Sequence, residues 1–181
     1  IATIYDDRIV PLQQLKVISD DYAVLVIDTV NKTNDKRMNI NQALENLQLA
    51  TDRIDETWTT YKQTKLTSKE KTLANEIEAL FVPADLKIDQ LRRVLEQKQG
   101  QELDILLDQF DGNLYDVIDP ITEKIHELIE LQLDVARQER EEARSIVTGI
   151  FWVFVPILVL TIGSMLPIRA LISKAILSAI K

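Results

Sequence analysis

The sequence predicts an all-α fold: an up-down-up-down antiparallel four-helix bundle that is continuous with an apolar C-terminal helix. Glycine and proline number only four and five among 181 residues, and such a composition favours long helices over sheets. Four stretches carry apolar residues at helical spacing and are joined by short polar segments. Residues 146–166 contain no ionisable side chain. These observations together define the predicted fold class.

The first predicted helix carries two apolar lines. The main line alternates spacings of four and three residues, as in helices that pack side by side, and consists of Pro11, Leu15, Ile18, Tyr22, Leu25 and Thr29. A second line, Val10, Val17 and Val24, repeats every seven residues on a neighbouring face. This second line indicates either a second packing partner or a wider core face. The polar residues 31–37 predict the end of the helix.

Capping boxes predict the starts of the second and third helices, because an N-cap side chain and a Gln or Glu three residues later satisfy each other's backbone N–H groups. Asn39 with Gln42 opens the second helix, and Thr67 with Glu70 opens the third. The second helix then presents one apolar stripe, formed by Ala43, Leu47, Ala50, Ile54, Trp58 and Tyr61.

The stripe of the third helix continues in phase across Pro83, which predicts a kink near residue 80 rather than the end of the helix. This stripe consists of Leu73, Ile77, Leu80, Ala84, Ile88, Leu91 and Leu95. We expect Gly100 to close the helix. Residues 101–111 are compatible with a short helix, and Gly112 is compatible with a break before the fourth helix.

The fourth predicted helix leads into the apolar segment. Its stripe consists of Leu114, Ile118, Ile121, Ile125, Leu128 and Val135. Neither Gly nor Pro occurs between residues 121 and 148, so we expect this helix to run without a break through the charged residues 137–144.

Residues 146–166 are long enough to cross a membrane, because a 21-residue helix spans roughly 30 Å, the thickness of the hydrocarbon core. The alternative is a buried core helix. The C-terminal tail holds Arg169, Lys174 and Lys181 and no acidic residue, so the positive-inside rule places it in the cytoplasm. The expected organisation is a domain outside the cytoplasm at 1–145, a transmembrane helix at 146–168 and a cytoplasmic segment at 169–181. Since residues 1–10 lack an apolar signal core, we expect an earlier membrane helix upstream.

Composition argues against several functions. All 29 acidic residues precede residue 146, together with 18 of the 21 Lys and Arg, so the N-terminal region repels nucleic acid. There is no cysteine and only one histidine, His126, so we expect no thiolate metal site and no histidine cluster. Phosphate-cradling glycine motifs are also missing from the sequence. We therefore expect no enzyme activity, no catalytic residues, no metal and no cofactor.

The first and last helices carry further recognisable sequence. Residues 5–32 read YDDRIVPLQQLKVISDDYAVLVIDTVNK, and residues 114–143 read LYDVIDPITEKIHELIELQLDVARQEREEA. These stretches resemble the first and last helices of the sensor bundles of bacterial chemoreceptors, the methyl-accepting chemotaxis proteins. Residues 172–176 (ISKAI) are similar to the opening of a HAMP signal-relay segment, with Ala175 where proline is usual.

The resemblance implies a chemoreceptor sensor domain in the bacterial inner membrane, with residues 1–145 periplasmic or extracellular. It implies a homodimer through the first helix, packed along Val10, Val17 and Val24, and cytoplasmic signalling proteins reached through domains beyond this chain. Two alternatives share these features: the sensor of a histidine kinase or cyclase, and a membrane-anchored helical adhesion or structural module without a ligand.

A sensor of this kind needs a place for a small-molecule ligand. The candidate residues are polar or aromatic and lie on or beside the predicted stripes: Tyr22, Thr29, Arg92, Arg93, Asn113 and Tyr115. An arginine beside a core stripe in an acidic domain can attract a carboxylate and hold it with two hydrogen bonds. The alternative is that both arginines reach solvent and pair with Asp89 or Glu96.

Overall fold

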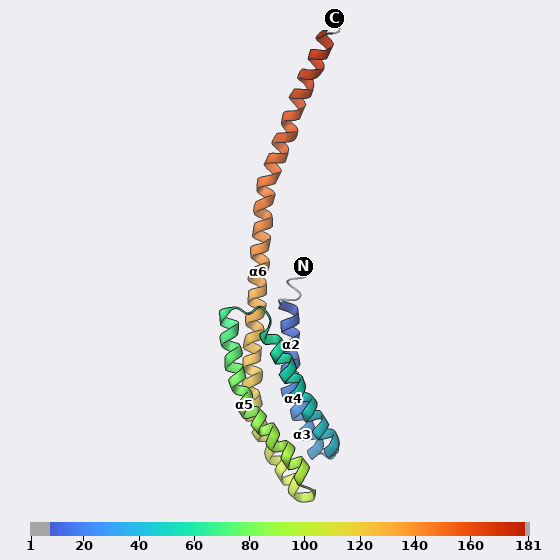
Figure 1. Cartoon of the computed structure of the whole chain (residues 1–181), viewed down its shortest axis with the longest axis vertical. Helices are drawn as coiled ribbons and strands as arrows, with labels where there is room; N and C mark the ends of the chain where they lie inside the picture. Colours follow the sequence, from blue (N-terminus) through green and yellow to red (C-terminus); the bar gives the residue numbers. More distant parts are fainter. Residues whose placement is uncertain (1–7, 180–181) are drawn as a thin grey trace. The chain divides into compact units, whose positions relative to one another are not determined.

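A computed structural model describes the backbone of residues 8–179 and the side chains of residues 8–163 except residue 111. The chain consists of two compact units, and the boundary between them lies between Ala136 and Arg137. In the first unit, four helical stretches lie side by side, and the first stretch contains three consecutive elements (Figure 1). The elements are α2 (Val10–Asp20), the π-helix η2 (Asp21–Val26), α3 (Ile27–Asn34), α4 (Ile40–Lys62), α5 (Ser68–Gln97) and α6 (Gly100–Ala179).

Hydrogen bonds between the first stretch and α6 establish their antiparallel packing. Near the start of the first stretch, Arg8 donates to the side chain of Gln132 at 3.1 Å. Near its end, Asn34 donates to the side chain of Asp108 at 2.6 Å. The two pairs run in opposite directions along the chain, so the predicted all-α, up-and-down four-helix bundle is confirmed.

The core of the bundle receives one apolar stripe from each helical stretch. The stripe predicted for α4 is buried at all its positions, and both predicted capping boxes are present, at Asn39 and Thr67. In α6 the buried positions include Leu114, Ile118, Ile121, Ile125 and Leu128, as predicted. Val135 is only half-buried, and the last buried position of α6 is the polar residue Gln132.

The first helical stretch differs from the sequence prediction in two ways. The π-helix η2 inserts one extra residue per turn, so Val26 is buried where the α-helical spacing had predicted Leu25. The helix also continues to Asn34 instead of ending at residue 31. It continues because Val30 and Thr33 face the core, and the Thr33 hydroxyl donates to the Thr29 carbonyl oxygen at 2.6 Å.

The helix α5 continues through Pro83, as predicted, but the stripe prediction was wrong at Leu73 and Leu80. Ala74 and Phe81 are buried, whereas Leu73 and Leu80 are half-buried. The buried positions keep an alternating spacing of three and four residues on both sides of Pro83, which is the spacing that holds one face of a helix against its neighbours.

The predicted break at Gly112 is wrong, because α6 begins at Gly100 and includes Gly112 in its interior. Only Lys98 and Gln99 separate α5 from α6, so residues 101–111 form the start of α6 and not a separate short helix. Leu103 and Leu107 are buried in phase with Leu114, and this packing outweighs the roughly 1 kcal/mol that an interior glycine costs a helix. The turn itself depends on Gly100, whose φ is +60°.

The second unit consists of the C-terminal part of α6. One helix in the described part of the chain is long and apolar enough to cross a membrane, and it includes residues 146–163. Its large apolar side chains, such as Trp152 and Leu160, are exposed in the absence of a lipid bilayer. The HAMP-like residues 172–176 are helical, but their side chains lie outside the described residues, so this resemblance stays a prediction.

We expect Gly100→Ala and Gly112→Ala to have opposite effects on stability. A Cβ at either position meets no atom within 4 Å, so only the backbone conformation distinguishes them. Because alanine is strained at positive φ, Gly100→Ala should lower the free energy of unfolding by about 1 kcal/mol. Gly112→Ala should raise it by up to about 1 kcal/mol. Urea unfolding of the chain in detergent measures both; equal effects would contradict the assigned turn.

Candidate functional site

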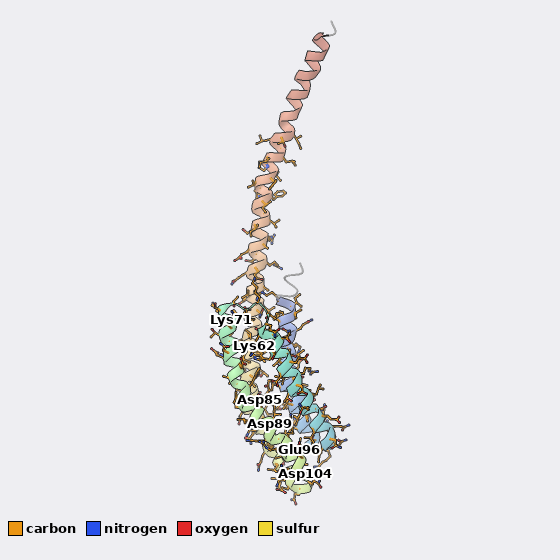
Figure 2. The ribbon with its side chains drawn as sticks, viewed as in Figure 1. Lys62, Lys71, Asp85, Asp89, Glu96 and Asp104 are labelled. Carbon is orange, nitrogen blue, oxygen red and sulfur yellow. The ribbon has the colours of Figure 1, made fainter. Side chains whose placement is uncertain are left out.

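A fully buried tyrosine and three carboxylates lie close together between α4 and α5. We name the carboxylates, Asp55 of α4 with Asp85 and Asp89 of α5, the carboxylate seam. Asp85 and Asp89 are labelled on α5 in Figure 2. Tyr22 reaches the carboxylate seam from η2. The side chain of Tyr22 is 0% exposed, and its hydroxyl interacts with the carboxylate of Asp85. Burial raises the pKa of this hydroxyl, and the negative charges of Asp85 and Asp55 raise it further.

The carboxylate seam is short of positive charge. Burial raises the pKa of Asp85 to about 6, and repulsion from Asp55 and Asp89 adds to this effect. Arg92 lies 3.9 Å from Asp89. Among the described residues, no cationic side chain lies within ion-pair distance of Asp55 or Asp85. Carboxyl groups with perturbed pKa values are found often at functional sites.

A cluster of aromatic rings packs in the core next to the carboxylate seam. The ring of Tyr22 lies 5.5 Å from that of Phe81, and the Phe81 ring lies edge-on at 5.0 Å from Trp58. Trp58 in turn stacks on Tyr61 at 5.3 Å. The indole N–H of Trp58 is buried without a hydrogen-bond partner in the described residues. This cluster packs η2, α4 and α5 together and fixes where the Tyr22 hydroxyl lies.

Of the ligand residues predicted from the sequence, Tyr22 and Arg92 lie along the carboxylate seam. Arg92 donates to Thr51 of α4 at 3.5 Å, and its Nε is buried without a partner in the described residues. Arg93 is exposed, as are Asn113 and Tyr115 on α6. The structure therefore does not gather the six predicted residues into one site.

The sixth predicted residue, Thr29, lines a different cavity: a groove of about 430 Å³ between the first helical stretch and α4. Its walls include Val24, Leu25 and Leu49, and its rim carries the ion pair of Arg53 with the buried Asp21. Asp21 raises the pKa of the Arg53 guanidinium through their hydrogen bond. The volume falls in the range of small-molecule sites.

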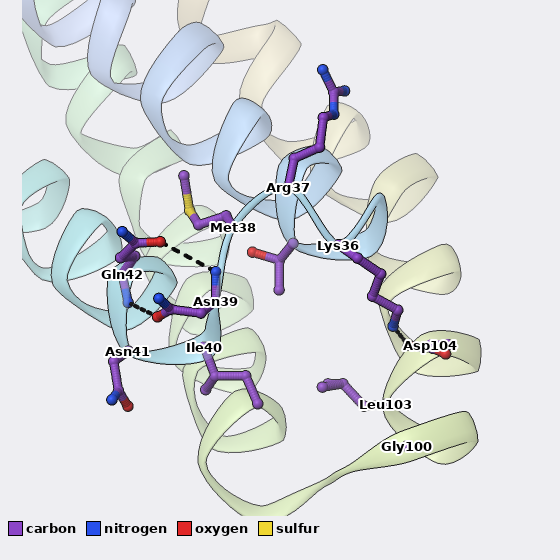
Figure 3. A pocket seen from close by; sticks show the side chains of 11 residues that line it. Lys36, Arg37, Met38, Asn39, Ile40, Asn41, Gln42, Gly100, Leu103 and Asp104 are labelled. Atoms are coloured by element: carbon purple, nitrogen blue, oxygen red, sulfur yellow. Dashed lines mark hydrogen bonds and ion pairs between the residues drawn. The ribbon is translucent and has the colours of Figure 1, made fainter.

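A second cavity, of about 680 Å³, lies at the end of the bundle where the α3–α4 connection meets the start of α6 (Figure 3). Lys36 closes one side through an ion pair with Asp104. The capping box of Asn39 and Gln42 forms the other side, as the dashed lines in Figure 3 show. Arg37 pairs with Asp35, so both of these loop cations, Lys36 and Arg37, contact acidic neighbours.

A buried polar network at the opposite end of the bundle was missed in the sequence. Arg8 donates to Glu70 and to Gln132, both at 3.1 Å, and Gln132 donates to the Tyr61 hydroxyl at 3.4 Å. Burial raises the pKa of Tyr61 to about 12, although the hydrogen bond from Gln132 opposes this shift. Each of the four helical stretches contributes one side chain. The sequence did contain a sign of this network: Glu70 and Gln132 occupy positions at which the helical spacing of the apolar stripes would place a core residue.

The valines predicted to form a dimer interface lie on the first helical stretch. Val10 and Val17 are half-buried, and Val24 is 54% exposed. Ile9, beside this line, is 42% exposed. The core of the bundle therefore leaves an apolar surface on this stretch uncovered, and the assignment of that surface to a dimer stays a prediction.

The fold and these sites define a helical sensory module, and comparison with known proteins identifies its family. Residues 1–147 match the family described as "Four helix bundle sensory module for signal transduction", and the chain belongs to it. The chain is 31% identical over 141 residues to the methyl-accepting chemotaxis protein NahY of Pseudomonas putida, which covers 78% of the chain and 26% of that protein. The chain thus spans about a quarter of its curated relative. No solved structure matches it.

The raised pKa of Asp85 predicts a pH-dependent effect of Asp85→Asn. The pKa of about 6 lies above the ordinary 3.8, so the fold binds this proton more tightly than the unfolded chain does. The ionised carboxylate therefore destabilises the fold above pH 6, and this cost disappears as the pH falls below 4. Because Asp85 is partly exposed, we discount the cost to about 1 kcal/mol.

At pH 7.5 we expect Asp85→Asn to raise the melting temperature by roughly 2–4 °C. At pH 3, below both pKa values, the variant and the wild type should melt together. Asp52→Asn is the matched control, because Asp52 is an exposed aspartate of α4 outside the carboxylate seam. Thermal denaturation followed by circular dichroism measures the effect, and a pH-independent difference would contradict the assigned pKa.

Proposed function

We propose that the chain is the extracytoplasmic sensor domain of a bacterial chemoreceptor, together with its second membrane helix. In this proposal residues 1–145 lie in the periplasm or outside the cell, residues 146–168 cross the inner membrane, and residues 169–181 begin a HAMP linker. One observation carries the proposal: the last helix of a four-helix sensory module, α6, is the same helix that contains the apolar segment. The similarity to a methyl-accepting chemotaxis protein favours a chemoreceptor over a kinase sensor or an adhesion module.

The function follows from a helix that reaches from a ligand site to the bilayer. Between residues 121 and 148 the helix α6 contains neither Gly nor Pro, so no hinge absorbs a displacement made in the bundle. Trp152 and Arg169 are suited to the two membrane interfaces. Moving such anchors costs fractions of a kcal/mol per ångström, whereas a micromolar ligand supplies about 8 kcal/mol. The binding energy of a ligand is therefore sufficient to displace α6 relative to the membrane. This displacement would carry the signal to cytoplasmic signalling proteins.

The ligand in this proposal is a small molecule bound by the bundle. The carboxylate ligand predicted from Arg92 and Arg93 requires an available guanidinium. Arg92 already contacts Asp89 and Thr51, and Arg93 is exposed. Both arginines remain candidates for binding a carboxylate, and Arg92 is the better placed because it lies at the seam between two helices.

A hybrid receptor tests this function. Residues 1–181 replace the sensor and membrane helices of a chemoreceptor whose control of its kinase is measurable in membranes. We expect a small molecule that stabilises the bundle to change kinase activity. Inserting Gly-Gly after Arg137 should abolish that response while leaving ligand affinity nearly unchanged, because the insertion interrupts α6 without touching the bundle. A normal response from the insertion variant would refute transmission through α6.

Dimerisation through the first helical stretch is a second expected property. We expect the double variant Val17→Glu, Val24→Glu to dimerise less, because each copy would then bury two carboxylates in an apolar interface. Sedimentation of the detergent-solubilised chain measures the dimer fraction. Val82→Glu is the matched control, since Val82 is 60% exposed on α5, away from that surface. Loss of helicity in the double variant would instead assign the valines to the core of one bundle.

A further inference from the structure

We propose that the groove between the first helical stretch and α4 binds a neutral small molecule that has an apolar body and a hydrogen-bond acceptor at one end. The inference names the ligand class of the sensor proposed above and rests on that function only for its role in signalling. The groove has a volume of about 430 Å³, and neither Arg92 nor Arg93 lines it. It is therefore separate from the arginines considered above for a carboxylate.

Two antiparallel helices give the groove a polar contact at each end and an apolar middle. At one end, Arg53 Nε donates to the Asp21 carboxylate at 2.7 Å, and at the other end Asn46 donates to the Thr29 hydroxyl at 3.4 Å. Leu49 lies between Asn46 and Arg53 on α4, and all three line the groove. Since seven residues of a helix rise roughly 10 Å, the groove accommodates an elongated molecule of about this length.

The π-helix η2 explains why the middle of the groove is apolar. An α-helical spacing would bury Leu25, but the extra residue in η2 buries Val26 in its place and leaves Leu25 half-buried in the wall of the groove. Val24 and Leu49, which also line the groove, are 54% and 52% exposed. Because apolar surface is unfavourable in water, a ligand with an apolar body gains free energy by covering these side chains.

The charges of the groove favour a neutral ligand. Each acidic residue that lines the groove already has a basic partner. The three ion pairs are Lys16 with Asp20 at 2.7 Å, Lys32 with Asp28 at 2.8 Å, and Arg53 with Asp21. A charged ligand would have to displace one of these partners or lose hydration without gaining a counter-charge. The groove should therefore discriminate against anions and cations alike.

Two side chains retain hydrogen-bond donors for a ligand. Of the five N–H groups of Arg53, those on Nε and Nη2 donate to Asp21, and the guanidinium donates to no other group in the described part of the chain. The Arg53 side chain is 46% exposed. The Asn46 amide makes only long contacts, to Thr29 at 3.4 Å and to the weakly accepting sulfur of Met38 at 3.6 Å. A carbonyl oxygen can accept from such donors without adding charge.

The test uses the 181-residue chain in phosphatidylcholine nanodiscs, with ¹³C in its methionine methyl groups. The chain has two methionines: Met38 lines the groove, and Met165 lies in the apolar residues 146–166 and reports partition of the probe into the bilayer. The probe is 2-heptanone, and heptanoate and heptylammonium at pH 7.5 are charged controls of equal chain length. We expect a saturable shift of Met38 with 2-heptanone, a non-saturating change at Met165, and at least tenfold weaker binding of both controls.

Three variants assign the binding to this groove. Leu49→Trp should abolish the saturable shift by filling the groove, and Leu49 does not line the other cavity that Met38 borders, at the end of the bundle. Leu86→Trp is the matched control, because Leu86 is 57% exposed on α5, and it should bind as the wild type does. Arg53→Lys keeps a positive charge opposite Asp21 but loses the remaining guanidinium donors, so it should weaken binding severalfold.

Three results would overturn the proposal: no saturable shift of Met38 with 2-heptanone, an unchanged shift in Leu49→Trp, or tighter binding of either charged control. A second copy of the chain is the other possible occupant of the groove. In that case Leu49→Trp would lower the dimer fraction in sedimentation while 2-heptanone left Met38 unchanged, and the proposal would be wrong.

The two proposals fail separately. If 2-heptanone does not bind, the hybrid receptor still tests the sensor function with other small molecules. If it binds but no ligand changes the kinase activity of the hybrid receptor, the sensor function fails while the binding site in the groove stands.

Discussion

Each helical stretch of the bundle must bury one apolar stripe, and a stripe can be buried only against the stripes of the other three. The alternating spacing of three and four residues keeps each stripe on one face over the whole length of the bundle. In α5 this spacing persists across Pro83, and in α6 it persists across Gly112, so packing decides the course of the helix at both residues. The position of every polar side chain discussed above follows from this constraint.

Polar groups enter the core at two levels. At one end, Arg8, Glu70, Gln132 and Tyr61 satisfy one another with hydrogen bonds that cross all four helical stretches. This network fixes the first stretch against α6, the helix that contains the apolar segment. Further along, the buried Tyr22 hydroxyl interacts with Asp85 of the carboxylate seam.

The π-helix η2 connects the fold to the candidate site. It inserts one residue into the first helical stretch between Asp21 and Val26, and Tyr22 lies within it. Asp21 is anchored to α4 through Arg53, while the Tyr22 ring packs on Phe81 of α5. Because π-helical turns occur frequently at functional sites, η2 makes this part of the bundle a candidate for ligand binding.

The sequence by itself determined the number of helices, their order, both capping boxes and the buried faces of α4 and α6, because these depend on local spacing and on N-cap chemistry. It also determined the sensory family, since the first and last helices carry recognisable sequence. Only the tertiary structure decided that Val26 replaces Leu25 in the core, that α6 continues through Gly112, and that Asp55, Asp85 and Tyr22 meet. Local spacing cannot reveal these features, since a π-turn, a helix held by packing and a seam between two helices all depend on neighbours distant in the chain.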